Sequence, residues 1–312
     1  MQNSHSPART PIRTDVLLFS HFSTLCLTNA VEPLRAANML SGRPLYRWRH
    51  LTLDARTVAS SSGLPVVPDG TLTGEAGDRL LVMPSYGVER LLTPTTLRTL
   101  RAAARRYGLV AGLDAGSWLM AAAGLLDGRR ATIHWDMLDA FAERFPEVEV
   151  QTERVVLDGP DRASCGGATT TLELMLHWIE QDHGTMLRLD VAALFMHGEK
   201  APSTSPAQTY GRRLDAVAAL MRRNIEVPLP IGEIAQRLGL TQRRLEDLVR
   251  RQAGRPPAAL YRSIRLREAR RMVETSTLRI AEIAPRCGYA DPAALTRAFR
   301  REFGTAPSAL RV

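Results

Sequence analysis

The N-terminal part of the chain alternates between short apolar runs and longer stretches whose apolar residues have helical spacing. Residues 14–20 (TDVLLFS) predict a buried strand, and residues 27–40 then predict a helix that ends at the SGRP sequence. Further strands are predicted at 46–53, 79–84 and 107–113, and helices at 93–106, 117–126 and 135–145. Such alternation is typical of a mostly parallel sheet covered on both faces, so we expect an α/β domain with a flavodoxin-like sheet.

The end of this domain and the start of a second one are visible in the same pattern. Residues 148–165 predict two short strands, and a long helix follows at 169–183. The run EKAPSTSPAQ at 199–208 is rich in proline and serine and has no periodicity, which is typical of a linker. We therefore place the first domain at 12–198, the linker at 199–208 and the second domain at 209–312.

The second domain is predicted to be all-α and to contain one motif twice. Residues 230–254 contain an apolar helix, a turn at Gly239 and a second helix that Thr241 would cap. Residues 279–304 repeat this layout, with a turn at Gly288. The second helix of that repeat would be capped by Asp291, with Pro292 as its first residue. Both repeats have the layout of a helix-turn-helix.

Residues 257–275 lie between the two motifs and predict one unbroken helix. Such a helix is about 28 Å long, which is close to the pitch of B-DNA at about 34 Å. This spacing favours insertion of both second helices into successive major grooves on one side of the duplex.

Composition narrows the class of protein. Hydrophobic residues make up 45% of the chain, which is enough for a sizeable core, and no apolar run reaches the length that a membrane helix needs. The N-terminal sequence is polar, so we expect a cytoplasmic protein with no membrane contact.

The cysteines Cys26, Cys165 and Cys287 are far apart and odd in number, which favours reduced thiols over a disulfide framework or a zinc site. We expect no metal and no cofactor.

The positive charge is concentrated in the last third of the chain. From residue 208 onward there are 21 Arg and 10 Asp or Glu, a net charge of +11, whereas the remainder has 20 Lys or Arg and 22 Asp or Glu, a net charge of −2. Lys200 is the only lysine beside 40 arginines, which is typical of a GC-rich coding sequence, so the argument uses the charge and not the arginine identity. A basic C-terminal domain indicates a polyanionic partner.

The second domain closely resembles the DNA-binding domain of the AraC/XylS family of bacterial transcription regulators. The resemblance rests on the pattern I-A-x-x-x-G-Y at 283–289, followed by LTRAFRREFG at 295–304 and a proline. It implies DNA as a partner, recognition helices that begin at Thr241 and Asp291, and contact with RNA polymerase. The residues that it places at the DNA are Thr241, Gln242, Arg243, Arg244, Glu246, Ala293, Ala294, Arg297 and Arg300.

The sequence departs from this family in two places. Asp247 stands where the family usually has a basic residue, and it would repel phosphate. Pro285 is expected to interrupt the first helix of the second motif. The alanines at 293 and 294 favour phosphate anchoring and contact with thymine methyl groups over hydrogen-bonded reading of bases by this half.

The first domain resembles the class I glutamine amidotransferase-like fold, as found in PfpI-type proteases and in the amidase-domain (GlxA-like) branch of AraC regulators. The matching phrases are VEPLRAAN, SSGLPVVPD, AGLLDGRRATIHW and CGGATTTLELMLHWI. Catalytic relatives carry a cysteine at a strand-to-helix turn, a histidine about 20 positions later and a glutamate on the first helix. The corresponding residues here are Asp114, His134 and Glu32.

Asp114 follows an apolar strand and precedes an alanine-rich helix, so it is expected on a sharp turn beside a helix N-terminus. The helix dipole favours a carboxylate there, but a carboxylate does not perform the amidase chemistry of a thiolate. The domain is therefore predicted to bind a ligand without catalysis. Ion pairing and cation–π contact would suit a cationic or polar metabolite such as an amine or betaine. The predicted effector-binding residues are Glu32, Tyr86, Asp114, Trp118 and His134, with Trp135 as a further aromatic candidate.

Each of these residues also has a purely structural interpretation. Asp114 alternatively caps the helix that follows, and His134 alternatively forms a hydrogen bond in the core. The two tryptophans alternatively pack in the core, and Glu32 alternatively compensates the dipole of the first helix. Cys165 is interpreted as a packing residue.

The sequence therefore predicts a ligand-responsive, sequence-specific DNA-binding regulator, most simply an activator, that is a homodimer and not an enzyme. An amidase or hydratase with a DNA-binding appendage is the alternative from another class. A ligand-free architectural protein is the third interpretation. Turnover that depends on Asp114 distinguishes the enzyme from the receptor.

Overall fold

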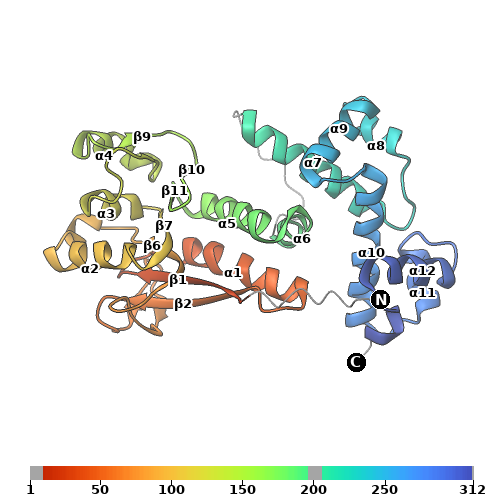
Figure 1. Ribbon diagram of the computed structural model, residues 1–312, viewed down its shortest axis with the longest axis horizontal. Helices are drawn as coiled ribbons and strands as arrows, with labels where there is room; N and C mark the ends of the chain where they lie inside the picture. The colour runs from red at the N-terminus through yellow and green to blue at the C-terminus, as the bar shows by residue number, and fades with distance from the viewer. Residues whose placement is uncertain (1–9, 196–205, 311–312) are drawn as a thin grey trace. The chain divides into compact units, whose positions relative to one another are not determined.

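The computed structural model describes residues 10–195 and 206–310 and divides the chain into two compact units, Met1–Leu194 and Phe195–Val312 (Figure 1). Each unit is described by itself. The linker expected at 199–208 lies outside the described residues up to position 205, and its last three residues begin helix α7 (Pro206–Arg223). No helix of the described residues is both long enough and apolar enough to cross a membrane.

The first unit is built around a seven-stranded sheet with the order β10-β11-β7-β6-β1-β2-β5. Every neighbouring pair is parallel except β10 with β11, which confirms the predicted mostly parallel sheet. Its strands are β1 (Ile12–Leu18), β2 (Tyr46–Thr52), β5 (Gly70–Thr71), β6 (Gly77–Met83), β7 (Tyr107–Leu113), β10 (Val155–Asp158) and β11 (Arg162–Cys165). Two smaller sheets pair β3 (Val58–Ala59) with β4 (Pro65–Val66), and β8 (Arg130–Ala131) with β9 (Glu149–Val150).

Helices cover both faces of this sheet. They are α1 (Thr24–Ser41), α2 (Pro94–Ala104), α3 (Gly116–Ala122), α4 (Leu138–Arg144), α5 (Ala168–His183) and α6 (Thr185–Phe195), with 3-10 turns at Val88–Leu91 (η1) and Trp135–Met137 (η2). Along β1, Val16 and Leu18 belong to the core that α1 and α5 cover, whereas Leu17 belongs to the core under α2, α3 and α4. Helices α1 and α5 lie side by side (Figure 1).

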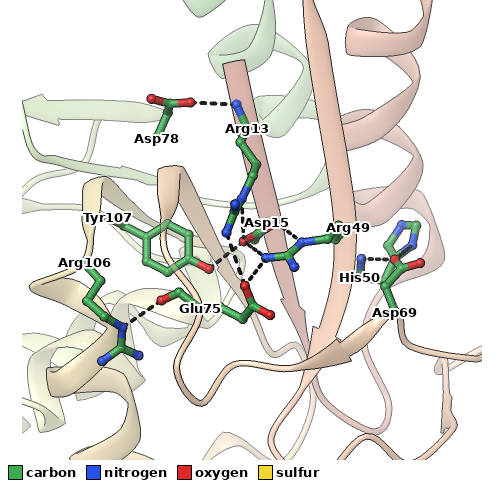
Figure 2. Close-up of polar contacts among 9 residues, drawn as sticks. All are labelled: Arg13, Asp15, Arg49, His50, Asp69, Glu75, Asp78, Arg106 and Tyr107. Carbon is green, nitrogen blue, oxygen red and sulfur yellow. Dashed lines mark hydrogen bonds and ion pairs between the residues drawn. The ribbon is translucent and has the colours of Figure 1, made fainter. Parts of the chain in front are cut away.

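A charged network ties β1, β2 and β7 together at the amino-terminal end of β1 (Figure 2). Asp15 is fully buried and accepts two hydrogen bonds from Arg49, of 3.0 Å from Nε and 2.7 Å from Nη2. The hydroxyl of Tyr107 donates a third bond of 2.6 Å to the same carboxylate. Glu75 completes the network with Arg49 at 2.8 Å and Arg13 at 3.2 Å. These charges therefore neutralise one another.

The second unit is all-α, as predicted. Its helices after α7 are α8 (Ile231–Arg237), α9 (Gln242–Ala253), α10 (Pro257–Thr275), α11 (Ile280–Arg286) and α12 (Pro292–Phe303), with a 3-10 turn at Pro307–Leu310 (η3). The pairs α8–α9 and α11–α12 form the two predicted helix-turn-helix motifs, and α10 has the predicted bounds. Apolar side chains of α10, α11 and α12 share one buried cluster, so the second motif is packed directly on the connecting helix.

The expectation that Pro285 interrupts its helix is wrong. Helix α11 continues through Pro285 to Arg286, and it is seven residues long, as is its counterpart α8. A proline so close to the end of a helix removes only one backbone hydrogen bond, which the packing of Ile283 and Ala284 in the core outweighs.

Candidate functional site

Asp114 lies on the sharp turn between β7 and α3, in the left-handed region of backbone conformation at φ +59°. Aspartate tolerates this conformation better than most residues, and such strain is concentrated at functional sites. The flanking glycines allow the turn to pack closely. A Cβ atom on Gly116 would lie 2.1 Å from the carbonyl oxygen of Val82, and one on Gly112 would lie 2.6 Å from the nitrogen of Ser117.

The turn is held at the carboxyl-terminal edge of the sheet by its neighbouring strands. The N–H of Asp114 donates to the carbonyl of Cys165 at the end of β11 (3.1 Å), and the N–H of Ala115 donates to that of Pro84 just after β6 (3.2 Å). The carbonyl of Asp114 accepts a bond of 3.3 Å from the N–H of His134. Open α/β sheets bind their ligands at this edge.

The carboxyl group of Asp114 is half-buried, and the hydroxyl of Ser85 is one of its polar neighbours. Burial raises the pKa of Asp114 above the ordinary aspartate value, and the nearby carboxylate of Asp136 adds to the rise. The hydroxyl of Ser85 and the nearby His134 act in the opposite direction. Asp114 therefore accepts a proton more readily than a solvent-exposed aspartate does.

Two further contacts connect this carboxyl group to its surroundings. The ring Nδ1 of His134 is hydrogen-bonded to the carboxylate of Asp136, which orients the imidazole. The oxygen of Ser85 also accepts a bond of 2.9 Å from the N–H of Ser23, the residue that caps α1. The site therefore contains two carboxylates beside one histidine, and it is joined to the N-terminus of α1.

Ser85 and Asp136 were not identified from the sequence. Ser85 lies two residues after the end of β6, and β6 is the neighbour of β7 in the sheet. Because the carboxyl ends of neighbouring parallel strands lie at one edge, a correct strand order would have predicted that Ser85 lies near Asp114. Asp136 lies two residues after His134, a spacing short enough for a local hydrogen bond.

The aromatic candidates separate into exposed and buried side chains. Tyr86 is 68% exposed and Trp135 is 75% exposed, and they directly follow Ser85 and His134 along the chain. The rings of His134 and Trp135 are 5.9 Å apart. Two large aromatic surfaces therefore stand in solvent next to the residues that surround Asp114.

Trp118 lies in the core, unlike the other two aromatic candidates. This side chain is buried and packs against Phe141 and Phe145, with ring centroids 5.9 Å and 5.3 Å away. Because these partners belong to α4 and the residue after it, Trp118 fixes that helix against α3. This environment agrees with the structural alternative raised from the sequence.

The ion pair that Glu32 forms lies within its own helix. Glu32 pairs with Arg35 at 2.7 Å, and its side chain is 40% exposed. On the same helix, the thiol of Cys26 interacts electrostatically with Asp114. Burial raises the pKa of the Cys26 thiol, and the neighbouring Cys165 and Asp114 raise it further.

Two alternatives for the remaining residues are resolved by the local geometry. The N-cap position of α3 is Ala115, and no side chain caps this helix, so Asp114 is not its capping residue. Cys165 is fully buried and lies 3.4 Å from the hydroxyl of Thr171, in agreement with a packing role.

The second unit presents two capped helices in matching positions. The side chain of Thr241 accepts a bond of 3.3 Å from the N–H of Arg244 at the start of α9. The side chain of Asp291 accepts one of 2.6 Å from the N–H of Ala294 at the start of α12. Both predicted caps are confirmed. Within α9, the amide of Gln242 donates to Glu246 at 3.0 Å, so these two exposed side chains orient each other.

Several arginines of this unit form ion pairs with glutamates: Arg237 with Glu233, Arg270 with Glu274, Arg271 with Glu268, and Arg279, the N-cap of α11, with Glu282. Within residues 206–310, no acidic side chain forms an ion pair with the arginines of α9 and α12, namely Arg243, Arg244, Arg250, Arg251, Arg297, Arg300 and Arg301. The two candidate recognition helices therefore carry seven arginines whose charge no ion pair within these residues compensates.

An open groove of about 480 Å³ runs along α12. It combines an apolar floor with hydroxyl and guanidinium donors, a combination that fits a sugar–phosphate strand. Its lining consists of Ile280, Pro292, Ala293, Thr296, Arg297, Arg300, Ala306, Pro307 and Ser308.

Two family models match the chain, a helix-turn-helix domain over residues 234–312 and the DJ-1/PfpI family over residues 18–181. The transcriptional regulator CdhR of Pseudomonas aeruginosa is 38% identical over 301 residues, 94% of this chain and 89% of that protein. The transcriptional regulator GlxA of Rhizobium meliloti is 37% identical over 319 residues, 98% of this chain and 97% of that protein.

Solved structures show the same likeness. An AraC family transcriptional regulator from Pseudomonas putida is 28% identical with a TM-score of 0.51, over 59% of this chain and all of the other. A ThiJ/PfpI family protein from Pseudomonas syringae is 20% identical with a TM-score of 0.52, over 68% of this chain and 87% of the other, which is a likeness of fold.

Proposed function

Because this chain belongs to the AraC-type helix-turn-helix transcriptional regulators that carry an N-terminal DJ-1/PfpI domain, we propose that its first unit is a non-catalytic receptor for a small cationic or polar metabolite. The second unit binds DNA, as in its relatives. A ligand then regulates transcription if it binds two conformations of the regulator unequally.

The observation that carries the receptor proposal is the carboxyl group at the β7–α3 turn. Asp114 occupies the position where catalytic members of this fold have a nucleophilic cysteine, and a carboxylate does not form the thioester on which amide hydrolysis at that position depends. Its neighbours supply a second carboxylate, Asp136, and among residues 10–195 no arginine acts on the pKa of Asp114. An ammonium group is the natural counterion for such a site.

The exposed aromatic side chains support a cation in particular. Tyr86 and Trp135 present their rings next to Ser85 and His134, and an aromatic face attracts a quaternary ammonium group by about 0.5–2 kcal/mol. Ordering of these two side chains around a ligand would bring their rings against it. The ligand class is therefore an amine or a betaine.

For the second unit we propose different tasks for the two recognition helices. Helix α9 offers Gln242, Arg243 and Glu246, which read bases by hydrogen bonds. Helix α12 offers Ala293, Ala294 and unpaired arginines, which suit thymine methyl groups and phosphate. One protomer then recognises two adjacent short sequences on the DNA. We further propose that the regulator is a homodimer and that RNA polymerase is its partner at the promoter.

The test is a thermal-shift screen of amines, betaines and amino acids with the full chain and with Asp114→Asn. We expect a compound that stabilises the wild type and changes its affinity for DNA, with both effects lost in Asp114→Asn. Asp127→Asn is the matched control, because Asp127 is an exposed aspartate of the same unit, and it should respond as the wild type does.

Equal stabilisation of the wild type and Asp114→Asn removes Asp114 from the ligand site. Hydrolysis of an amide or ester by the wild type that Asp114→Asn abolishes establishes the enzyme instead of the receptor.

A further inference from the structure

The residues that connect α7 to α8 form a second link between the two helix-turn-helix motifs, beside helix α10. They extend from 224 to 229, immediately before the first motif, and are called the α7–α8 segment below. The hydroxyl of Tyr261 on α10 donates to the carbonyl of Asn224 at 2.6 Å and accepts from the N–H of Leu229 at 3.3 Å. Tyr261 is buried, so one side chain of α10 holds both ends of the segment.

The middle of the segment packs against the second motif. Ile225 contacts the apolar cluster that α10, α11 and α12 share. Its carbonyl oxygen lies 2.6 Å from the position that a Cβ atom on Gly288 would occupy, and Cγ of Pro228 lies 2.7 Å from that position. Gly288 is the turn between α11 and α12, at φ +71°. This close approach is possible because residue 288 has no side chain.

Helix α10 also holds the turn of the second motif directly. Nε of Arg265 donates to the carbonyl of Cys287 at 2.8 Å, and Nη2 of the same side chain donates to the carbonyl of Gly288. Arg265 lies one helical turn after Tyr261, so both side chains project from one face of α10. The segment and the turn are therefore attached to α10 side by side and to each other.

The corresponding turn of the first motif has no such contact. Gly239 has nearly the same backbone conformation, at φ +65°, but a Cβ atom there would meet nothing within 4 Å. Glycine is favoured at 239 by the backbone conformation alone, whereas at 288 the contact with the segment also demands it. The two glycines therefore separate backbone strain from contact between the motifs.

We propose that the contact of Gly288 with the α7–α8 segment fixes α12 relative to α9 and thereby determines how many base pairs separate the two sequences that one protomer recognises. The inference rests on the proposed function, in which both helices contact one duplex. Gly288 is a positioning residue, because it acts through the segment and not on a base or phosphate.

The physical reason is that two bodies joined by one helix can bend and twist relative to each other. A second link beside that helix closes a ring and removes this freedom. One additional base pair displaces the second sequence by about 3.4 Å along the DNA and rotates it by about 34° around the DNA axis. Two recognition helices held rigidly cannot follow this change, so one of them loses its contacts with bases.

The experiment measures how affinity depends on spacing. The probe is a duplex that the wild-type full chain selects from random sequences, trimmed to one pair of segments protected in a hydroxyl-radical footprint. Fluorescence anisotropy compares it with duplexes in which one base pair is inserted or deleted between the two segments. For the wild type we expect each change to weaken binding by about ten-fold or more.

In Gly288→Ala the new methyl group forces the segment away from the turn. We expect binding to the selected duplex to weaken by about ten-fold, and the penalty for a changed spacing to fall to about three-fold or less. Tyr261→Phe, which removes both hydrogen bonds to the segment, should lower the penalty in the same direction. Gly239→Ala is the matched control, since it carries the same backbone strain and should keep the wild-type penalty.

The penalty is a ratio of two affinities of the same protein, so a general loss of stability does not change it. Circular dichroism establishes which variants are folded, and Tyr261→Phe decides the question if Gly288→Ala is not. Wild-type penalties in the folded variants at 261 and 288, or a lowered penalty in Gly239→Ala, overturn the assignment while recognition of two sequences stands. A wild type that tolerates every spacing also overturns it, whereas a footprint with a single protected segment contradicts the proposed function itself.

Discussion

Asp15 and Asp114 are aspartates of the same sheet with opposite surroundings. Asp15 is fully buried and accepts bonds from Arg49 and Tyr107, so its charge is compensated. Asp114 is half-buried, lies near the hydroxyl of Ser85, and has a second carboxylate close by. Burial raises the pKa of Asp114, whereas the pKa of Arg49 is raised mainly by its hydrogen bond to Asp15. The charge of the first aspartate is therefore compensated within the fold, whereas that of the second lacks such a partner, as the proposed ligand site requires.

We predict that Asp15→Asn destabilises the first unit. The substitution leaves the guanidinium of Arg49 without its bidentate partner, and breaking a buried pair costs about 3–5 kcal/mol. Arg49 is 31% exposed, so solvent reduces the cost to about 2–3 kcal/mol. Urea denaturation followed by circular dichroism measures this change. Asp54→Asn, which removes an exposed ion pair with Arg56, should leave the midpoint almost unchanged, and equal midpoints for both variants contradict the prediction.

The second prediction at this scale concerns pH. Since burial raises the pKa of Asp114, the folded protein binds a proton at a higher pH than the unfolded chain does. Asp114 therefore opposes folding when it is ionised, and this penalty disappears as the pH falls through its raised pKa. A cationic ligand loses its counterion over the same interval, which lies above the ordinary aspartate value of about 3.9.

Calorimetric titration at several pH values tests this prediction. The affinity of the wild type for a cationic ligand should decline as the pH falls toward that interval, and Asp114→Asn should bind weakly at every pH. An affinity that rises on acidification excludes an ionised Asp114 as the counterion.

At the scale of elements, local sequence determines some boundaries and long-range pairing determines others. Strand β7 and helix α10 have the predicted bounds. A continuous apolar run marks the strand and unbroken helical spacing marks the helix, and both patterns lie within the element itself. Strand β1 begins at Ile12 rather than residue 14, since Ile12 pairs with Tyr46 of β2. The two-residue strands β3, β4, β8 and β9 have no periodicity, so nothing local predicts them.

The same distinction applies to the site. Asp114 and His134 were predicted because a family resemblance marks their positions, and Asp114 also lies at a strand-to-helix turn that its flanking residues define. The packing of Trp118 against Phe141 and Phe145 was not predictable, because it depends on how α4 folds back onto α3, a contact that no local pattern encodes. The ion pair of Glu32 with Arg35 was open to prediction from their spacing of three along one helix.

We predict that the arginines of α12 and α10 differ in their effect on DNA binding. Arg300 lies in the groove along α12 with no acidic side chain in ion-pair range among the described residues, whereas Arg271 of α10 is paired with Glu268. Arg300→Gln should weaken binding to specific and non-specific DNA alike and reduce the slope of log K against log salt by about one. Arg271→Gln is the control and should leave the slope unchanged. Fluorescence anisotropy over a salt series measures both, and identical slopes for the two variants place Arg300 away from phosphate.

At the scale of the whole molecule, the division by charge agrees with the division by structure. The first compact unit ends at Leu194, and residues 195–207 carry no net charge, since Glu199 and Lys200 cancel. The residues from 208 onward carry a net charge of +11 and the rest of the chain a net charge of −2. A basic surface attracts any polyanion over a long range, whereas a nearly neutral receptor unit does not compete for it. The division therefore separates attraction to DNA from the recognition of a metabolite that we propose for the first unit.

This separation predicts how binding to DNA should depend on salt in the full chain and in the fragment 206–312. The fragment carries one pair of recognition helices, so the slope of log K against log salt reports the phosphates that one protomer neutralises, at about −0.9 for each. If the first unit joins two chains, the full-length dimer places two such pairs on one duplex, and its slope should be about twice that of the fragment on a DNA containing both sites. On a DNA with a single site the two slopes should agree, because only one protomer then makes specific contact. A full chain whose slope equals that of the fragment on both DNAs binds as a monomer, and its first unit then contributes nothing to the electrostatics of the complex.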